Sequence, residues 1–189
     1  MNSKSKVLMI IASLLLLLLF IFPLWQISLY APQYPAGLKM YLNIDGISDG
    51  EPGDIANINI MNHYVGMKQI HEDDFKEFQY MPYIIIGLSI LGLLVAFIKK
   101  RNLILVWLIL ITVLGVLGLY DFYQWEYNYG HNLDPHAAIQ VPGAAYQPPL
   151  FGSKEILNFT ASSYPQLGAL IIAISMALGA FAWYIGKKK

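Results

Sequence analysis

The sequence predicts an all-α membrane protein with four transmembrane helices, N-in and C-in, and a small extracytoplasmic cap formed by two long loops. The first observation is composition: hydrophobic residues make up 57% of the 189 residues and charged residues only 13%, against about 25% charged in ordinary globular domains. The second is that the apolar residues gather in four blocks. The third is that basic and acidic residues are sorted between alternate connecting segments.

The four apolar blocks are 7–25, 82–98, 103–120 and 165–186, and none contains a charged residue. Each is roughly 17 to 22 residues long, which is enough to cross about 30 Å of hydrocarbon at ~1.5 Å per residue. Pro82 and Pro165 stand where helices would start, a position that tolerates a missing N–H. The predicted division is 1–25 for the N-terminal tail and first span, 26–81 for the first extracytoplasmic segment, 82–120 for the second and third spans with their turn, 121–164 for the second extracytoplasmic segment, and 165–189 for the fourth span and basic tail.

The first block has a second interpretation, because Lys4 and Lys6 precede an apolar core as in a cleaved signal peptide. Against this, the core is long and continues through Trp25. The one plausible cleavage point, after Ala31, would place Pro32 directly behind the cut. We therefore expect a retained anchor.

The orientation follows from the basic residues. Eight of the twelve Lys and Arg residues lie at the N-terminus, in the turn between the second and third spans, and at the C-terminus. With four spans these places share one side, and the positive-inside rule makes that side the cytoplasm. All twelve acidic residues and all four histidines fall in 26–81 and 121–164. The predicted location is the bacterial inner membrane, with both long segments outside.

The composition excludes several classes of function. With no cysteine, the chain has no disulfide, thiolate zinc site, iron–sulfur cluster or covalently attached haem. A net charge of zero offers no basic face for nucleic acid. The blocks hold no ionisable side chain of the kind that marks an ion or proton pathway. In the fourth block, a row of small residues predicts close helix packing, either inside the bundle or against a partner's helix: Ala169, Ala173, Ala177 and Ala180.

The two outer segments are longer than connections need, so we expect them to carry structure of their own. In the first, 39–44 alternates like a strand, and Asp54 reads as the N-cap of a short helix over 55–63. The acidic run between them fits solvated turns better than a calcium loop. In the second, Asp134 and Pro135 predict the start of a short helix that ends by Pro142 and Gly143. The prolines in 146–150 predict extended chain.

Histidines and methionines in these segments form a candidate copper site. His63, Met67 and His71 recur every four residues, which places them on one face if the helix is continuous, whereas a helix end at Gly66 would separate them. Imidazole and thioether groups suit Cu(I) without any cysteine. If the segments pack together, ligands from both share one compartment. The predicted metal ligands are His63, Met67, His131 and His136, followed by His71, Met61 and Met40.

Three strings carry a resemblance to a known family. They are Asn59-Ile60-Met61-Asn62-His63-Tyr64-Val65-Gly66-Met67, Tyr127-Asn128-Tyr129-Gly130-His131-Asn132-Leu133-Asp134-Pro135-His136, and Val141-Pro142-Gly143 leading to Tyr146-Gln147-Pro148-Pro149-Leu150. They resemble the small four-span membrane protein, often called NosB, of clade II nitrous-oxide-reductase gene clusters. The resemblance covers nearly the whole chain, with its motifs in the outer segments. It implies an accessory role in denitrification, supporting a copper enzyme outside the cytoplasm, and it assigns no catalytic residue.

The expected function is therefore a non-enzymatic accessory protein that supports the assembly or copper supply of an extracytoplasmic copper enzyme, with copper as cofactor. Its expected partners are the lipid bilayer and proteins of copper-enzyme maturation, and no nucleic acid. An alternative is a structural or docking subunit of a membrane transporter or electron-transfer complex, with ordinary surface histidines and no metal site. A third is quinone or lipid binding at the aromatic residues around Tyr123 and Trp125.

Overall fold

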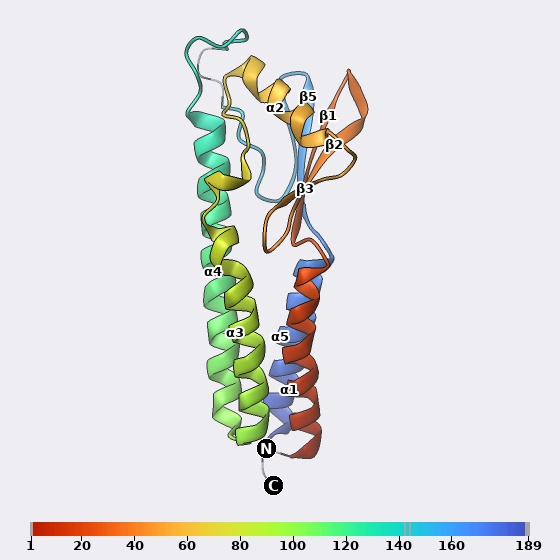
Figure 1. Ribbon diagram of the computed structural model, residues 1–189, viewed down its shortest axis with the longest axis vertical. Helices are drawn as coiled ribbons and strands as arrows, with labels where there is room; N and C mark the ends of the chain where they lie inside the picture. The colour runs from red at the N-terminus through yellow and green to blue at the C-terminus, as the bar shows by residue number, and fades with distance from the viewer. Residues whose placement is uncertain (1, 142, 144, 188–189) are drawn as a thin grey trace.

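The computed structural model describes residues 2–141, 143 and 145–187. Four long helices form a bundle at one end of the molecule, and a sheet with one short helix lies at the other end (Figure 1). The elements in chain order are α1 (Ser3–Leu15), η1 (Leu16–Phe20), β1 (Trp25–Ala31), β2 (Tyr34–Leu42), β3 (Ile47–Asp49), α2 (Asp54–Val65), η2 (Glu72–Asp74), α3 (Glu77–Ile98), α4 (Arg101–His131), β4 (Gly152–Ile156), β5 (Phe159–Pro165) and α5 (Leu167–Ile185).

The prediction of four membrane-spanning helices is confirmed in number. Four helices of the described chain are long and apolar enough to cross a membrane: Ser3–Phe20, Glu77–Ile98, Arg101–His131 and Leu167–Ile185. Their ends differ from the apolar blocks. The first helix stops at Phe20, and Pro82 lies inside α3 instead of at its start. Helix α4 continues well past Tyr120, the last residue of its apolar block, so residues 121–131 rise out of the bundle beside the sheet (Figure 1).

The bundle packs around Trp107 of α4, which is fully buried. Its indole Nε1 donates to the carbonyl of Leu88 on α3 at 2.8 Å, and its ring lies where a Cβ on Gly179 of α5 would meet it at 2.9 Å. The buried small residues of α5 are Gly168, Ser175, Gly179 and Ala182. Ala173, Ala177 and Ala180 are exposed, so the expectation that this row packs inside the bundle is wrong, and packing against a partner's helix stays a prediction.

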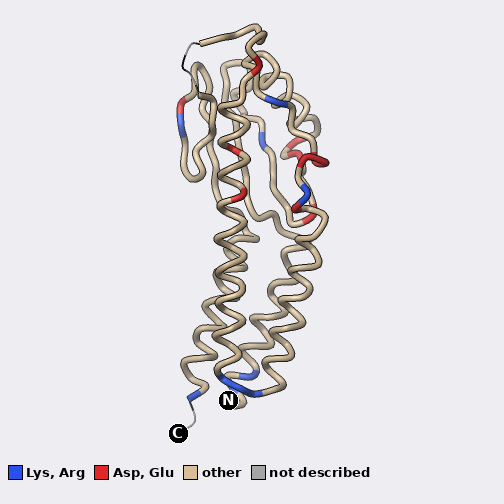
Figure 2. The backbone as a smooth tube through the Cα atoms, turned by 90° about the vertical axis from the view of Figure 1, so that its left-hand side faces the viewer, with Lys and Arg blue, Asp and Glu red and all other residues tan. Residues whose placement is uncertain are grey.

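Charge is sorted along the long axis as the sequence predicted. Lys and Arg cluster at the free end of the bundle, with a few more at the sheet end, and Asp and Glu lie toward the sheet (Figure 2). Lys188 and Lys189, two of the basic residues used to predict the orientation, fall outside the described residues. The end of the molecule that holds the sheet and most of the acidic residues, residues 25–76 and 121–166, is called the cap below.

The cap holds a five-stranded antiparallel sheet in the order β3-β2-β1-β5-β4. The all-α prediction is thus wrong for this part of the chain. Strand β1 was not predicted from the sequence, because it directly follows an apolar block. The alternation that buries Ile27 and Leu29 is difficult to distinguish from the end of that block. It pairs with β5 from Trp25↔Pro165 to Tyr30↔Thr160, so the two outer segments share one sheet.

Helix α2 forms where the first outer segment predicted it. Asp54 does not cap it in the usual way, because its Oδ2 accepts from the backbone N–H groups of Lys39 at 3.0 Å and Glu51 at 2.9 Å, which ties the helix start to β2. The helix ends at Val65, and Gly66 has a φ of 81°. Met67 and His71 therefore lie beyond the helix.

The short helix predicted from Asp134 is absent from the described part of 132–141. The backbone of this segment instead forms hydrogen bonds with the end of α2. The N–H of Asp134 donates to the carbonyl of Gly66 at 2.8 Å, and the N–H of Ile139 donates to the carbonyl of Tyr64 at 2.9 Å. The predicted end of this helix involves Pro142, which lies outside the described residues. Asp134 instead accepts from the N–H of His136 at 2.8 Å, as in an Asx turn.

Candidate functional site

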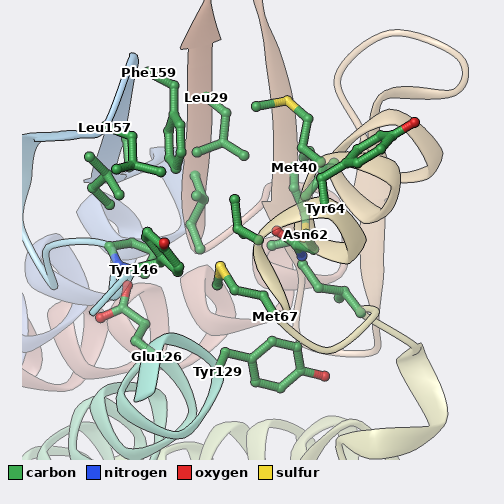
Figure 3. A pocket seen from close by; sticks show the side chains of 18 of the residues that line it. Leu29, Met40, Asn62, Tyr64, Met67, Glu126, Tyr129, Tyr146, Leu157 and Phe159 are labelled. Carbon is green, nitrogen blue, oxygen red and sulfur yellow. The ribbon is translucent and has the colours of Figure 1, made fainter. Parts of the chain in front are cut away.

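The apolar core of the cap surrounds a cavity of about 160 Å³ (Figure 3). The sheet forms one wall, α2 and the chain after it form a second, and the upper part of α4 with the chain that follows it forms a third. The lining residues are Ile27, Leu29, Gln33, Met40, Ile58, Met61, Asn62, Tyr64, Val65, Met67, Ile70, Trp125, Glu126, Tyr129, Ile139, Tyr146, Pro148, Ile156, Leu157, Asn158, Phe159 and Ala161.

Strand alternation explains the sheet wall. Ile27 and Leu29 of β1 are two residues apart, so both side chains point to the same face of the sheet. Ile27 is paired with Met40 of β2, and Leu29 is paired with Ala161 of β5. All of these side chains are buried. This face is therefore a continuous apolar floor built from both outer segments.

Helix α4 forms the opposite wall because aromatic residues continue its apolar face beyond Tyr120. Phe122 packs edge-on against Trp25 of β1 with ring centroids 5.7 Å apart. One turn further on, Trp125 contacts Tyr129 at 4.6 Å between centroids. The 31-residue helix is thus a membrane span at one end and a wall of the cap at the other.

One end of the cavity carries polar groups without partners. Glu126 is 0% exposed and Tyr146 is 2% exposed. Both carboxylate oxygens of Glu126 and the hydroxyl of Tyr146 are buried and have no hydrogen-bond partner among the described residues. Nε1 of Trp125 is also buried, and its indole packs against Tyr129. Figure 3 shows Glu126 and Tyr146 at the same end of the cavity. Buried polar groups are nearly always hydrogen-bonded, so this cluster is exceptional.

Burial sets the protonation of the carboxyl group. Residue 126 lies beyond the apolar block of α4, in the part of the helix that packs on the cap. Loss of solvation there raises the pKa of Glu126 to about 8. The side chain is therefore mostly a neutral carboxylic acid at pH 7, able both to donate and to accept a hydrogen bond.

A glycine fixes the position of Tyr146. The N–H of Tyr146 donates to the carbonyl of Gly130 at 2.9 Å. A Cβ on Gly130 would overlap the backbone of Gln147, so only glycine lets this segment lie against α4. The close approach brings Tyr146 to the helix one turn beyond Glu126.

The predicted metal ligands divide into two groups. Met40, Met61 and Met67 all line the cavity, although they come from β2, α2 and the chain after α2. The histidines are exposed: His63 on α2, His71 before η2, His131 at the end of α4 and His136 in the Asp134 turn. Within the described residues, no three His, Asp or Glu side chains come close enough to hold a metal ion.

His131 has local contacts only. Its Nδ1 lies 2.9 Å from the carbonyl oxygen of Tyr127, and its ring stacks on the Tyr127 ring with 3.9 Å between centroids. His63 lies near Tyr64 at 6.3 Å between ring centroids. The structure therefore brings the methionines together at one cavity and leaves the histidines on its outside.

Comparison with protein-family models, with curated proteins and with solved structures gave no match. The resemblance to NosB-type proteins stays a prediction, and function has to be argued from the cavity itself.

Sequence reasoning did not predict that Glu126 and Tyr146 line one cavity. A signal for Glu126 was present, because it is a lone acidic residue among aromatic ones in 122–129. A helix continued past Tyr120 with a period near 3.6 would have put it on the same side as Trp125 and Tyr129. No comparable signal marks Tyr146, whose burial depends on the contact at Gly130.

Proposed function

We propose that this chain is a non-enzymatic accessory protein of the bacterial cytoplasmic membrane whose extracytoplasmic cap binds a small ligand in the cavity. The observation that carries the proposal is the set of unpartnered polar atoms on Glu126 and Tyr146 in a mainly apolar lining. Each buried polar group without a partner costs about 1–3 kcal/mol, and a bound ligand would offset that cost. An apolar pocket with a few placed polar groups is the usual form of a small-molecule site.

The charge distribution supports the orientation in this proposal. Basic residues at the free end of the bundle favour the cytoplasm by the positive-inside rule, which leaves the cap outside. The two outer segments, 26–81 and 121–164, carry all twelve acidic residues of the chain. Four membrane helices would hold the cavity at a fixed height above the bilayer, where a partner enzyme could reach it.

Binding is tested with protein that contains 5-fluorotryptophan at its four tryptophans, placed in lipid nanodiscs. Toluene is titrated and followed by ¹⁹F NMR, with the Trp125 signal assigned from the Trp125→Phe variant. A cavity of about 150 Å³ takes a benzene-sized molecule, so we expect a saturable shift of the Trp125 signal. The Trp107 signal, from the bundle, reports non-specific uptake.

A filled cavity provides the matched variant. Ala161 is fully buried and lines the cavity, so Ala161→Leu should abolish the toluene shift. The control is Ala56→Leu on the exposed side of α2, which should bind like the wild type. A Trp125 signal that stays unmoved, or that moves equally in Ala161→Leu, would overturn the proposal.

A second candidate is that the cavity holds copper(I) for an extracytoplasmic enzyme such as nitrous oxide reductase. The observation in its favour is that the thioether side chains of Met40, Met61 and Met67 line the same cavity. Thioethers are ligands that select Cu(I). The acidic cap would raise the local cation concentration, and His63, His71, His131 and His136 remain predicted ligands on its surface.

Anaerobic titration with Cu(I) separates the two ligand sets. If the cavity binds the metal, the triple variant Met40→Leu, Met61→Leu, Met67→Leu should lose one copper per chain, because leucine keeps the volume and removes the sulfur. Met176→Leu in the bundle is the matched control. Loss of binding only in the His63→Ala, His131→Ala double variant would favour the histidines. Absence of saturable binding in the wild type would end the copper candidate.

A further inference from the structure

The chemistry at the polar end of the cavity specifies its ligand more closely. The Tyr146 hydroxyl and a neutral Glu126 carboxyl each carry one donor hydrogen and can also accept a hydrogen bond. Both groups are buried, and neither has a partner among the described residues. A ligand oxygen acceptor can bind both donor hydrogens at once, so it is the complementary ligand group.

The charges around the cavity favour an uncharged ligand. Among the described lining residues there is no Lys, Arg or His, and Glu126 is the one acidic residue. A bound anion would have no cationic partner there. A bound cation would require Glu126 to ionise inside an apolar wall, which burial opposes.

The other residues that line the cavity determine the size and polarity of the rest of the ligand, called its body below. It consists mainly of aliphatic, methionine and aromatic side chains, such as Ile27, Ile58, Met67 and Phe159. The volume of about 160 Å³ is close to that of cavities that accept a single benzene ring. The body is therefore apolar and about the size of one aromatic ring.

We infer that the cavity selects a small uncharged molecule with an apolar body and a carbonyl-type oxygen, and that Glu126 and Tyr146 hold this oxygen. The inference rests on the proposed ligand-binding function and adds the class of ligand. The apolar body fills the space beside the sheet, and the oxygen accepts hydrogen bonds from the groups that otherwise have no partner.

Four probes of similar size and different polar groups test the inference: acetophenone, toluene, benzylammonium and benzoate. Each is titrated into the 5-fluorotryptophan protein in nanodiscs, and the Trp125 signal gives its dissociation constant. We expect acetophenone to bind about tenfold more tightly than toluene, the effect of one or two net hydrogen bonds. Benzylammonium and benzoate should bind more weakly than toluene.

Variants identify the groups responsible. Glu126→Leu should bring the affinity for acetophenone down to that for toluene, whereas Glu126→Gln, which keeps an N–H donor, should retain most of it. Tyr146→Phe should weaken acetophenone binding several-fold and leave toluene unchanged. Glu155→Leu, at an exposed position of β4, is the matched control. A residue that acts only through packing would alter toluene and acetophenone alike.

The outcomes separate this inference from the proposed function. Equal affinity for toluene and acetophenone, unaffected by Tyr146→Phe, would overturn the ligand class and leave the binding function in place. Preferred binding of benzylammonium would overturn it in favour of a cationic ligand and an ionised Glu126. If no probe shifts the Trp125 signal, the binding function itself fails.

Discussion

The N–H of Tyr146 donates to the carbonyl oxygen of Gly130 at 2.9 Å, and this bond holds the chain after α4 against the helix. Glu126 lies one turn earlier on the same helix. The bond thus brings Tyr146 close to the helix that carries Glu126, and both residues have buried polar atoms without a partner among the described residues. This backbone contact helps to form the polar end of the cavity.

Replacement of this glycine should disturb both stability and binding. Gly130→Ala would place a Cβ against the Gln147 backbone, which cannot move away as a side chain could. We expect a loss of about 1–3 kcal/mol in stability and weaker probe binding at Trp125. Gly115→Ala on the same helix is the control: its Cβ meets open space, and it should stabilise by up to about 1 kcal/mol. Equal thermal midpoints for the two variants would contradict this account.

The pH dependence of stability should report the buried carboxyl. Burial raises the pKa of Glu126 from its usual 4.5 to about 8. Between these values the folded protein keeps a proton that the unfolded chain has lost, so stability falls as pH rises through this window and levels off above it. The slope from this group approaches about 1.4 kcal/mol per pH unit.

Glu126→Gln removes that dependence, since glutamine does not titrate. The thermal midpoint of the variant relative to the wild type should therefore be higher at pH 9 than at pH 5. Measurement of both proteins in the same detergent over this range checks the sign. A difference that does not change with pH would show that Glu126 is not protonated in the folded state.

Asp54 should be needed to join α2 to the sheet. Its Oδ2 accepts from the N–H groups of both Lys39 and Glu51, and the residue is buried. Asp54→Ala leaves two backbone donors without their partner, which should lower stability by about 1–3 kcal/mol. The exposed Asp45 provides a matched control, since Asp45→Ala should have little effect in chemical denaturation. If the two variants unfold at the same denaturant concentration, Asp54 does not have this role.

The chain has no cysteine, so its orientation can be tested with single introduced thiols. Ser153→Cys on the exposed part of β4 should react with a membrane-impermeant maleimide in intact cells. Asn102→Cys, at the opposite end of the molecule, should react only after the membrane is permeabilised. The reverse pattern would contradict the proposed orientation.

The sequence predicted the bundle well because span length, apolar composition and charge sorting are local properties. It predicted the sheet poorly because the pairing of Trp25 with Pro165 joins residues from opposite ends of the chain. The helix expected at Asp134 failed for a similar reason, since the N–H of Ile139 donates to the carbonyl of Tyr64 in α2 and not to the preceding turn of its own segment. A local helix propensity is overridden where a residue distant in the sequence accepts the backbone hydrogen bond instead.

The candidate site shows the same division. Chemical type singled out methionines of the outer segments, and Met40, Met61 and Met67 line one cavity, whereas their metal binding stays a prediction. The spacing argument that joined Met67 to His63 and His71 failed, because Gly66 ends the helix with a φ of 81°. Only the fold could show that Glu126 and Tyr146 share the same space.

The central place of β1 has a consequence for biosynthesis. This strand emerges from the ribosome directly after the first membrane helix, but β5, its neighbour in the sheet, is translated only after α2, α3 and α4. Until then one edge of β1 stays open, since β2 can cover only the other. The cap therefore cannot close before the last span is ready to insert, and a nascent chain that stalls earlier would display an unpaired strand edge prone to aggregation.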